Sequence, residues 1–112
     1  MQRVETASHR RKQFSVLLRT RGAQAATMTL APGATSNEDS ANEHGWAEQW
    51  LYVVSGAGSA RVGKRTVKLR EGSLLVIEKR EPHLIRAGKR SKLVTFNLYV
   101  PPAYDAKGAP LR

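Results

Sequence analysis

Short runs of β-forming residues, each ended by glycine, proline or a polar turn, follow one another along most of this chain. The runs recur about every 8–12 residues, and no segment has the 3.6-residue apolar periodicity of an amphipathic helix. This rhythm is typical of an antiparallel sandwich or a small barrel. The 112 residues leave room for one such domain, since a domain takes about 150 residues. We therefore expect a single all-β domain of about eight strands.

The predicted strands are separated by recognisable turns. The tripeptide Ala31-Pro32-Gly33 fits a type II turn, with glycine at the position that needs a positive φ. Pro101 and Pro102 end the last strand, because neither can donate a ladder hydrogen bond. The strands expected from this punctuation are Phe14–Arg19, Ala23–Leu30, Gln49–Ser55, Ser59–Val62, Thr66–Leu69, Ser73–Glu78, His83–Ala87 and Leu93–Val100.

The two ends of the chain differ in composition from the middle. Residues 1–12 are polar and charged without periodicity, so we expect a flexible basic arm. Residues 13–104 contain all the predicted strands and form the expected β-barrel domain. Residues 105–112 are left as a C-terminal tail.

Composition excludes several classes of protein. The chain has no cysteine, which excludes a disulfide scaffold, a thiolate zinc site, an iron–sulfur cluster and a cysteine nucleophile. Its longest apolar runs are too short to cross a bilayer, and the N-terminus lacks the apolar core of a signal peptide. We therefore expect a cytoplasmic protein with no membrane partner.

The chain is strongly basic, and the charge is unevenly distributed. It has 19 Lys and Arg against 9 Asp and Glu, a formal net charge of +10. No Lys or Arg lies between Gly22 and Ala60, a stretch that contains four acidic residues. Such a balance favours anionic partners. We do not expect a nucleic acid to be the main partner, because the chain has few aromatics for a sheet platform and no helix to read bases.

Three residues have side chains suited to a polar site, namely His44, Gln49 and His83. Imidazole nitrogens and amide oxygens suit Zn, Ni, Fe or Mn better than Ca or Mg. The ordinary alternative is that His44 lies in a loop, Gln49 caps a strand end and His83 forms a hydrogen bond to the backbone.

The motifs of nucleotide-binding sites are absent from the sequence. Gly56-Ala57-Gly58 begins a Gly-x-Gly-x-x-Gly pattern, but Arg61 takes the place of its third glycine.

The stretch from Leu30 to Tyr104 resembles a small single-domain cupin, whose fold is a double-stranded β-helix, or jelly-roll barrel. The spacing of the two cupin motifs brings four residues into register with them, His44, Gly56, Gly72 and His83. Six motif positions differ and are occupied by Ser36, Asn42, Gln49, Glu78, Arg80 and Ala87.

The resemblance implies a site inside the barrel. Cupins commonly hold a divalent metal with three histidines and a glutamate, and the corresponding residues here are Asn42, His44, Gln49 and His83. The two amides in this set are weaker ligands than an imidazole and a carboxylate. Without a metal, the same groups would form a polar lining able to bind a small organic acid or sugar.

The expected function is therefore that of a small cupin binding a small polar or anionic molecule in its barrel, through a divalent transition metal where one is bound. The alternative is a non-catalytic ligand-sensing or basic nucleic-acid-associated module without metal. Isomerase, dioxygenase or decarboxylase chemistry stays open, as does whether the chain is an enzyme. Glu43 and Glu48 flank the ligand positions and are expected to be solvated, with a general-base role as the alternative.

The two tryptophans frame the expected site. Trp46 can either stack on a ligand or pack against the protein, and the sequence does not choose between these. Alternation on the predicted strand puts Gln49, Leu51 and Val53 on one face and Trp50, Tyr52 and Val54 on the other. An outward Trp-Tyr-Val row would expose a large apolar patch on a monomer, so we expect a homodimer.

Overall fold

The computed structural model describes residues 1–37 and 44–112, and the described chain is almost entirely β-strand. A single 3-10 turn, Thr6–His9, is its one helical element. The strands match the predicted ones to within one residue at each end. They are β1 Phe14–Arg19, β2 Gln24–Leu30, β3 Glu48–Ser55, β4 Gly58–Val62, β5 Arg65–Leu69, β6 Leu74–Ile77, β7 His83–Ala87 and β8 Leu93–Val100.

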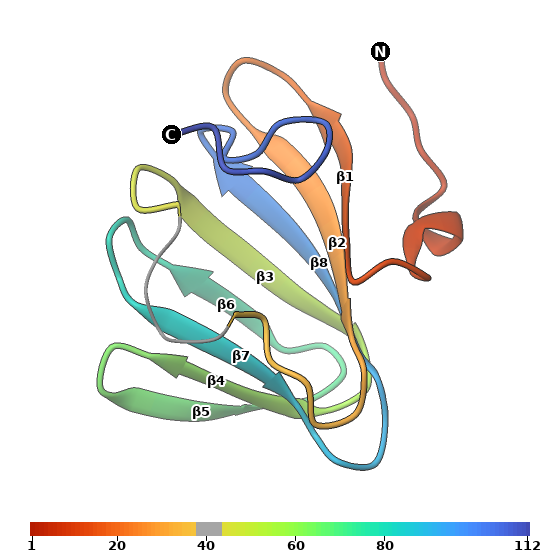
Figure 1. Cartoon of the computed structure of the whole chain (residues 1–112), viewed down its shortest axis with the longest axis vertical. Helices are drawn as coiled ribbons and strands as arrows, with labels where there is room; N and C mark the ends of the chain where they lie inside the picture. The colour runs from red at the N-terminus through yellow and green to blue at the C-terminus, as the bar shows by residue number, and fades with distance from the viewer. Residues whose placement is uncertain (38–43) are drawn as a thin grey trace.

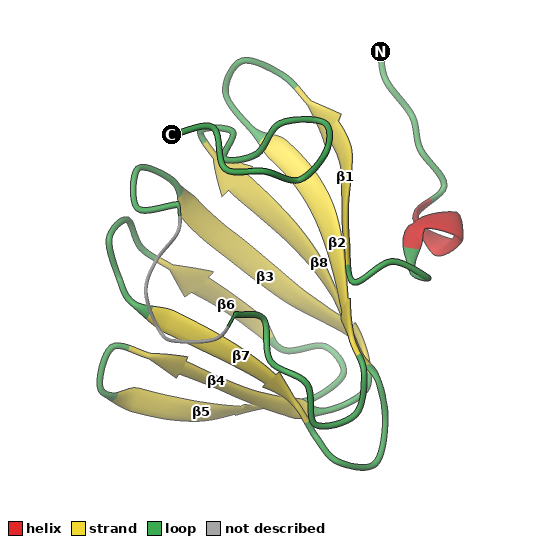
Figure 2. Cartoon of the chain, in the orientation of Figure 1, coloured by secondary structure: helices red, strands yellow, loops and turns green. Residues whose placement is uncertain are grey.

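The strands form two antiparallel sheets (Figure 1; Figure 2). The five-stranded sheet has the order β1-β2-β8-β3-β6 and the three-stranded sheet the order β5-β4-β7. The last strand of the domain, β8, pairs with β2 on one side and β3 on the other. The two sheets are not joined into one closed ring of hydrogen bonds, but their strand order is that of a double-stranded β-helix, which confirms the predicted fold class.

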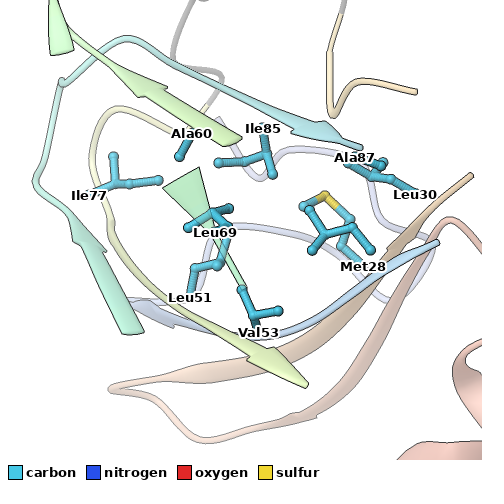
Figure 3. Packing of buried hydrophobic residues seen from close by; sticks show 10 residues of the cluster. Met28, Leu30, Leu51, Val53, Ala60, Leu69, Ile77, Ile85 and Ala87 are labelled. Atoms are coloured by element: carbon cyan, nitrogen blue, oxygen red, sulfur yellow. The ribbon is translucent and has the colours of Figure 1, made fainter. Parts of the chain in front are cut away.

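The main core lies between the sheets. Buried side chains of both sheets meet there, including Leu51 and Val53 from β3 and Ile85 and Ala87 from β7 (Figure 3). A second, smaller cluster contains Tyr99 and residues that follow β8. The polar site described below borders both clusters, because its lining includes Ile85 of the first and Tyr99 of the second.

Side chains of β3 alternate between the core and the solvent, as predicted. Leu51 and Val53 are fully buried, whereas Trp50 and Tyr52 are 42% and 43% exposed. Trp50 pairs with Val76 of β6 and Leu98 of β8, so the apolar row continues across three strands. We call this row the outer apolar face and define it as Trp50, Tyr52, Leu74, Val76 and Leu98.

The loop between β2 and β3 starts with the predicted turn. Gly33 has a φ of +78°, and the Ala34 N–H donates to the Ala31 carbonyl over 2.9 Å, as in a type II turn. The chain then runs antiparallel to β7, where the Ser36 N–H donates to the Ile85 carbonyl. This pairing brings residues 36 and 37 to the space between the sheets.

The N-terminal segment is attached to β1, the edge strand of the five-stranded sheet. Gln2 Nε2 donates to the Arg19 carbonyl, and His9 Nδ1 lies 2.9 Å from the Ser15 hydroxyl. The flexibility expected of this arm stays a prediction. No helix of the described chain has the length and apolar character needed to cross a membrane.

Candidate functional site

A cavity of about 160 Å³ opens between the two sheets. Its apolar wall includes Met28 of β2 and Ile85 of β7. Its polar wall includes side chains from separate loops and strands, namely Ser36, Asn37, His44, Gln49 and His83. The polar wall therefore brings together residues that are far apart in the sequence, such as Ser36 and His83, which are separated by 47 positions.

Local structure explains how three of these side chains reach the cavity. Gln49 is the second residue of β3 and belongs to the inward row with Leu51, so its amide is buried. His83 is the first residue of β7 and follows Pro82, which keeps it at the end of the sheet. His44 precedes β3 in a turn closed by the Ala47 N–H, which donates to the His44 carbonyl. None of the three residues is more than 6% exposed.

His44 and Gln49 are hydrogen-bonded to each other. The His44 Nε2 atom lies 2.9 Å from Gln49 Oε1. Because an amide oxygen only accepts, this contact requires the proton on His44 Nε2. The His83 ring lies next to this pair, with its centroid 5.0 Å from that of His44. The three residues thus form one polar cluster.

The cluster continues into the sheet through a chain of buried hydrogen bonds. Gln49 Nε2 donates to Asn97 Oδ1 over 2.9 Å, and Asn97 Nδ2 donates to Thr95 Oγ1 over 3.0 Å. Thr95 Oγ1 in turn donates to the Met28 carbonyl. Every amide in this chain uses both its oxygen and its nitrogen, so the orientation of Gln49 towards His44 is set by residues of β8 and β2.

His83 is oriented by the backbone of the preceding loop. Its Nδ1 atom lies 3.1 Å from the Glu81 carbonyl, which can only accept, so Nδ1 carries the proton in this contact. In the neutral ring, Nε2 is then an acceptor. His44 differs, because both of its ring nitrogens lie near acceptors: Nε2 is 2.9 Å from Gln49 Oε1, and Nδ1 is 3.4 Å from the Ala47 carbonyl oxygen.

Aromatic rings close one end of the cavity. Tyr99 of β8 and Tyr104 stand edge to face, with centroids 5.0 Å apart, and Phe14 of β1 lies 4.8 Å from Tyr104. Tyr99 also contacts the His44 ring at 5.0 Å. These rings give the cavity an apolar side next to its polar cluster.

Tyr104 is held in place by a buried glutamine 80 residues earlier in the sequence. Gln24 Oε1 accepts from the Ala103 and Tyr104 N–H groups, and its Nε2 donates to the Tyr104 carbonyl. The turn that follows is closed by Asp105. Hydrogen bonds from the Ala109 and Lys107 N–H groups hold the pKa of the Asp105 carboxyl below its usual value.

The structure brings three of the four sequence-predicted ligands together. His44, Gln49 and His83 all line the cavity. Asn42 lies outside the described residues, as does Glu43. Their assignment stays a prediction.

The other residues considered from the sequence lie elsewhere. Trp46 packs against the second core cluster and donates from its indole N–H to the Pro102 carbonyl, so packing accounts for it. Trp50 faces away from the cavity, on the outer apolar face. Glu48 is partly buried and pairs with Val100 across the ladder.

Sequence reasoning missed Asn97, Tyr99 and Tyr104. A signal for the first two was present, because the inward row of the predicted strand Leu93–Val100 contains Thr95, Asn97 and Tyr99, which are polar or carry a hydroxyl. A polar row on a buried face predicts a hydrogen-bond network. Tyr104 carried no such signal, because Gln24 positions it through a contact between the two ends of the domain.

The described residues do not fit the divalent metal that the family resemblance implies. No three His, Asp or Glu side chains come together among the residues that the structure describes. The His44 Nε2 and Gln49 Oε1 atoms, which would be two of the ligand atoms, are instead bonded to each other. A cation there would break this bond and receive no compensating negative charge from the described lining of the cavity.

The fold has many relatives among solved structures. A protein from Bacillus halodurans matches with a TM-score of 0.78 at 18% sequence identity, over 91% of this chain and 82% of that protein. KdgF from a Halomonas species matches with a TM-score of 0.70 at 20% identity, over 80% and 77% of the two chains. A protein from Thermus thermophilus matches with a TM-score of 0.75 at 15% identity, over 88% and 96%. At these identities, the likeness concerns the fold alone.

Sequence comparison assigns the family directly. No curated protein matches the chain. The family described as "Cupin domain", however, matches it over residues 26–99, which include most of β2, all of β3 to β7, β8 up to Tyr99 and all three polar residues of the cluster. The chain therefore belongs to the cupin domain family.

Proposed function

We propose that this cupin binds a small carboxylate in the cavity between its sheets, without a metal. The observation that carries the proposal is the composition of the cavity wall. It includes two imidazoles, two glutamines, an asparagine, a serine and two tyrosines, and no Asp or Glu among its described residues. Groups of this kind can donate hydrogen bonds, and the positive charge of the chain attracts anions.

The size of the cavity limits the ligand. Its volume of about 160 Å³ is below the range of about 300–1,000 Å³ that is usual for pockets that bind drug-sized molecules. This suits an organic acid of a few carbon atoms. The aromatic wall of Tyr99 and Tyr104 supports the apolar part of such a molecule, while the second N–H of Gln49 Nε2 can donate to its carboxylate.

The test compares an acid with its neutral isostere. Succinate and succinamide are titrated into the protein, and the NMR signals of the histidine rings and of the Gln49 side chain are followed. We expect saturable shifts with succinate and much weaker binding of succinamide. Equal binding of the two molecules would contradict a carboxylate site.

Histidine variants locate the site. His83→Ala is expected to weaken succinate binding about tenfold, the worth of one hydrogen bond of about 1.4 kcal/mol, which His83 donates from Nε2 when its ring is protonated on both nitrogens. His83→Asn, which keeps a polar side chain, serves as a second variant. The control is His9→Ala, which removes the one histidine of the chain that does not line the cavity. Unchanged affinity in both His83 variants would contradict the proposal.

A divalent metal, Zn, Ni, Fe or Mn, at His44, Gln49 and His83 is the alternative that the family resemblance implies and that the His44–Gln49 hydrogen bond disfavours. Elemental analysis of the purified protein separates the two. About one metal per chain, with succinate binding lost on chelation, would support the metal. Binding that survives chelation supports the carboxylate site without a metal.

A further inference from the structure

The outer surface of the three-stranded sheet concentrates positive charge. Ser59 of β4 pairs with Lys68 of β5 on one side and with Arg86 of β7 on the other, so these three residues form a row across the sheet. Their neighbour Ala60 is fully buried, which places the row on the face away from the core. Arg61 and Thr66 pair in another row, and both are exposed.

The surrounding hairpin turns add to this charge. Residues 58–70 and 84–92 contain nine of the chain's 19 basic residues and no acidic one. All nine are exposed. Arg3–Glu5 is the one ion pair within the described residues, so none of the nine is neutralised there by a described carboxylate.

A hollow lies at one end of this sheet, where the last residues of β5 and β7 and the first residue of β4 meet the adjoining turns. A shallow hollow of about 890 Å³ is bordered by Ser59 and by four basic side chains, Lys68, Arg70, Arg86 and Lys89. We call these five residues the basic face. The backbone of Gly58 and Gly88 forms part of its wall.

We propose that the basic face binds the phosphate backbone of a nucleic acid without reading its bases. Several exposed cations spread over one sheet match the repeated charge of a phosphate chain better than a single small anion. The face has no aromatic side chain, so it offers no stacking platform for bases. It also lacks an exposed apolar side chain that would enter a membrane, because Leu84, the outward apolar residue of β7, is partly buried.

This proposal does not depend on the carboxylate site. Recognition of bases needs aromatic side chains that stack on them or a helix that contacts their edges. The sequence disfavours recognition of this kind. Contacts to phosphate need only accessible cations, and the structure collects them on one surface. No described residue lines both the cavity and the hollow, so both ligands can be bound together.

The test measures binding of a short fluorescein-labelled single-stranded DNA, and of its duplex, by fluorescence anisotropy between about 50 and 200 mM salt. We expect affinity to fall steeply with salt and to vary little with base sequence. Lys68→Glu with Arg86→Glu should weaken binding at least tenfold and lower the slope of log K against log salt by about two, one for each phosphate contact. Lys68→Gln with Arg86→Gln should have a smaller effect in the same direction.

The matched control is Arg19→Glu with Arg21→Glu, at the β1–β2 hairpin. This control and the variant with Lys68→Glu and Arg86→Glu each lower the formal net charge of the chain by four, from +10 to +6. An equal loss of binding in the control would overturn the proposal, because the effect would then belong to net charge. Salt-independent binding, or binding to phosphatidylserine vesicles and not to DNA, would overturn it as well.

Discussion

A few buried polar residues determine how the cavity is built. Gln49 links His44 to Asn97, and Asn97 links Gln49 to Thr95. Each hydrogen bond contributes little alone, but the donors and acceptors are satisfied only as a set. Changing one member leaves a buried neighbour unpaired, which costs about 1–3 kcal/mol.

Two buried threonines test this interpretation at the residue scale. The Thr95 hydroxyl both donates and accepts, whereas the Thr27 hydroxyl has no hydrogen-bond partner within the described chain. Thr95→Val should therefore lower the free energy of unfolding by about 1 kcal/mol or more, and Thr27→Val should leave it unchanged or raise it slightly. Chemical denaturation measures both. Similar losses in the two variants would show that the hydrogen-bond chain contributes nothing specific.

At the scale of elements, two glycines determine how strands meet. Gly56 and Gly72 both have a positive φ, of 87° and 89°, and both match the cupin motifs in the sequence. Their surroundings differ. A Cβ on Gly56 would lie 1.9 Å from the Lys92 carbonyl oxygen, just before β8, whereas a Cβ on Gly72 would meet nothing within 4 Å. Gly56 thus permits the close approach of β3 and β8, the strands that carry Gln49 and Asn97.

Alanine substitutions separate these two roles. Gly72→Ala is expected to cost about 1 kcal/mol, from the unfavourable φ alone. Gly56→Ala adds a backbone clash and should cost on the order of 3 kcal/mol. It should also change the NMR signals of the Gln49 side chain, because β3 and β8 would have to separate. Equal melting temperatures of the two variants would show that the close approach at Gly56 contributes nothing to stability.

For the whole molecule, two surfaces on different sheets have opposite character. The outer apolar face on the five-stranded sheet contains no charged residue among its five side chains. Leu74 is the most exposed of the five, with 65% of its surface accessible. The basic face includes the outside of the three-stranded sheet and the turns at one end of it. A second copy of the chain is the partner we propose for the apolar face, because two uncharged faces can meet while the basic faces stay apart.

Analytical ultracentrifugation tests this homodimer. The wild-type chain is expected to sediment as a dimer. Trp50→Lys with Leu74→Lys should shift it to the monomer, since a buried unpaired charge at an interface is strongly unfavourable. Leu111→Lys, at an exposed apolar residue outside the face, is the control. A monomeric wild type would contradict the prediction.

Much of the fold could be predicted because its signals are local. Strand ends follow from glycine and proline, and the two faces of β3 follow from alternation, which correctly predicts Gln49 on the inside and Trp50 on the outside. The family motifs added the register of His44 and His83. The partners of these residues were harder to predict, because Asn97 meets Gln49 across 48 residues of sequence.

By itself, the sequence determined which residues form strands and which side of β3 is buried, since both depend on neighbours one or two positions away. Other features are visible only in the tertiary structure. There, β8 lies between β2 and β3, and the ends of the domain meet through Gln24 and Tyr104. Nine basic residues from two segments also lie around one sheet. Pairing between distant strands is selected by how the whole core packs. No local pattern encodes that choice.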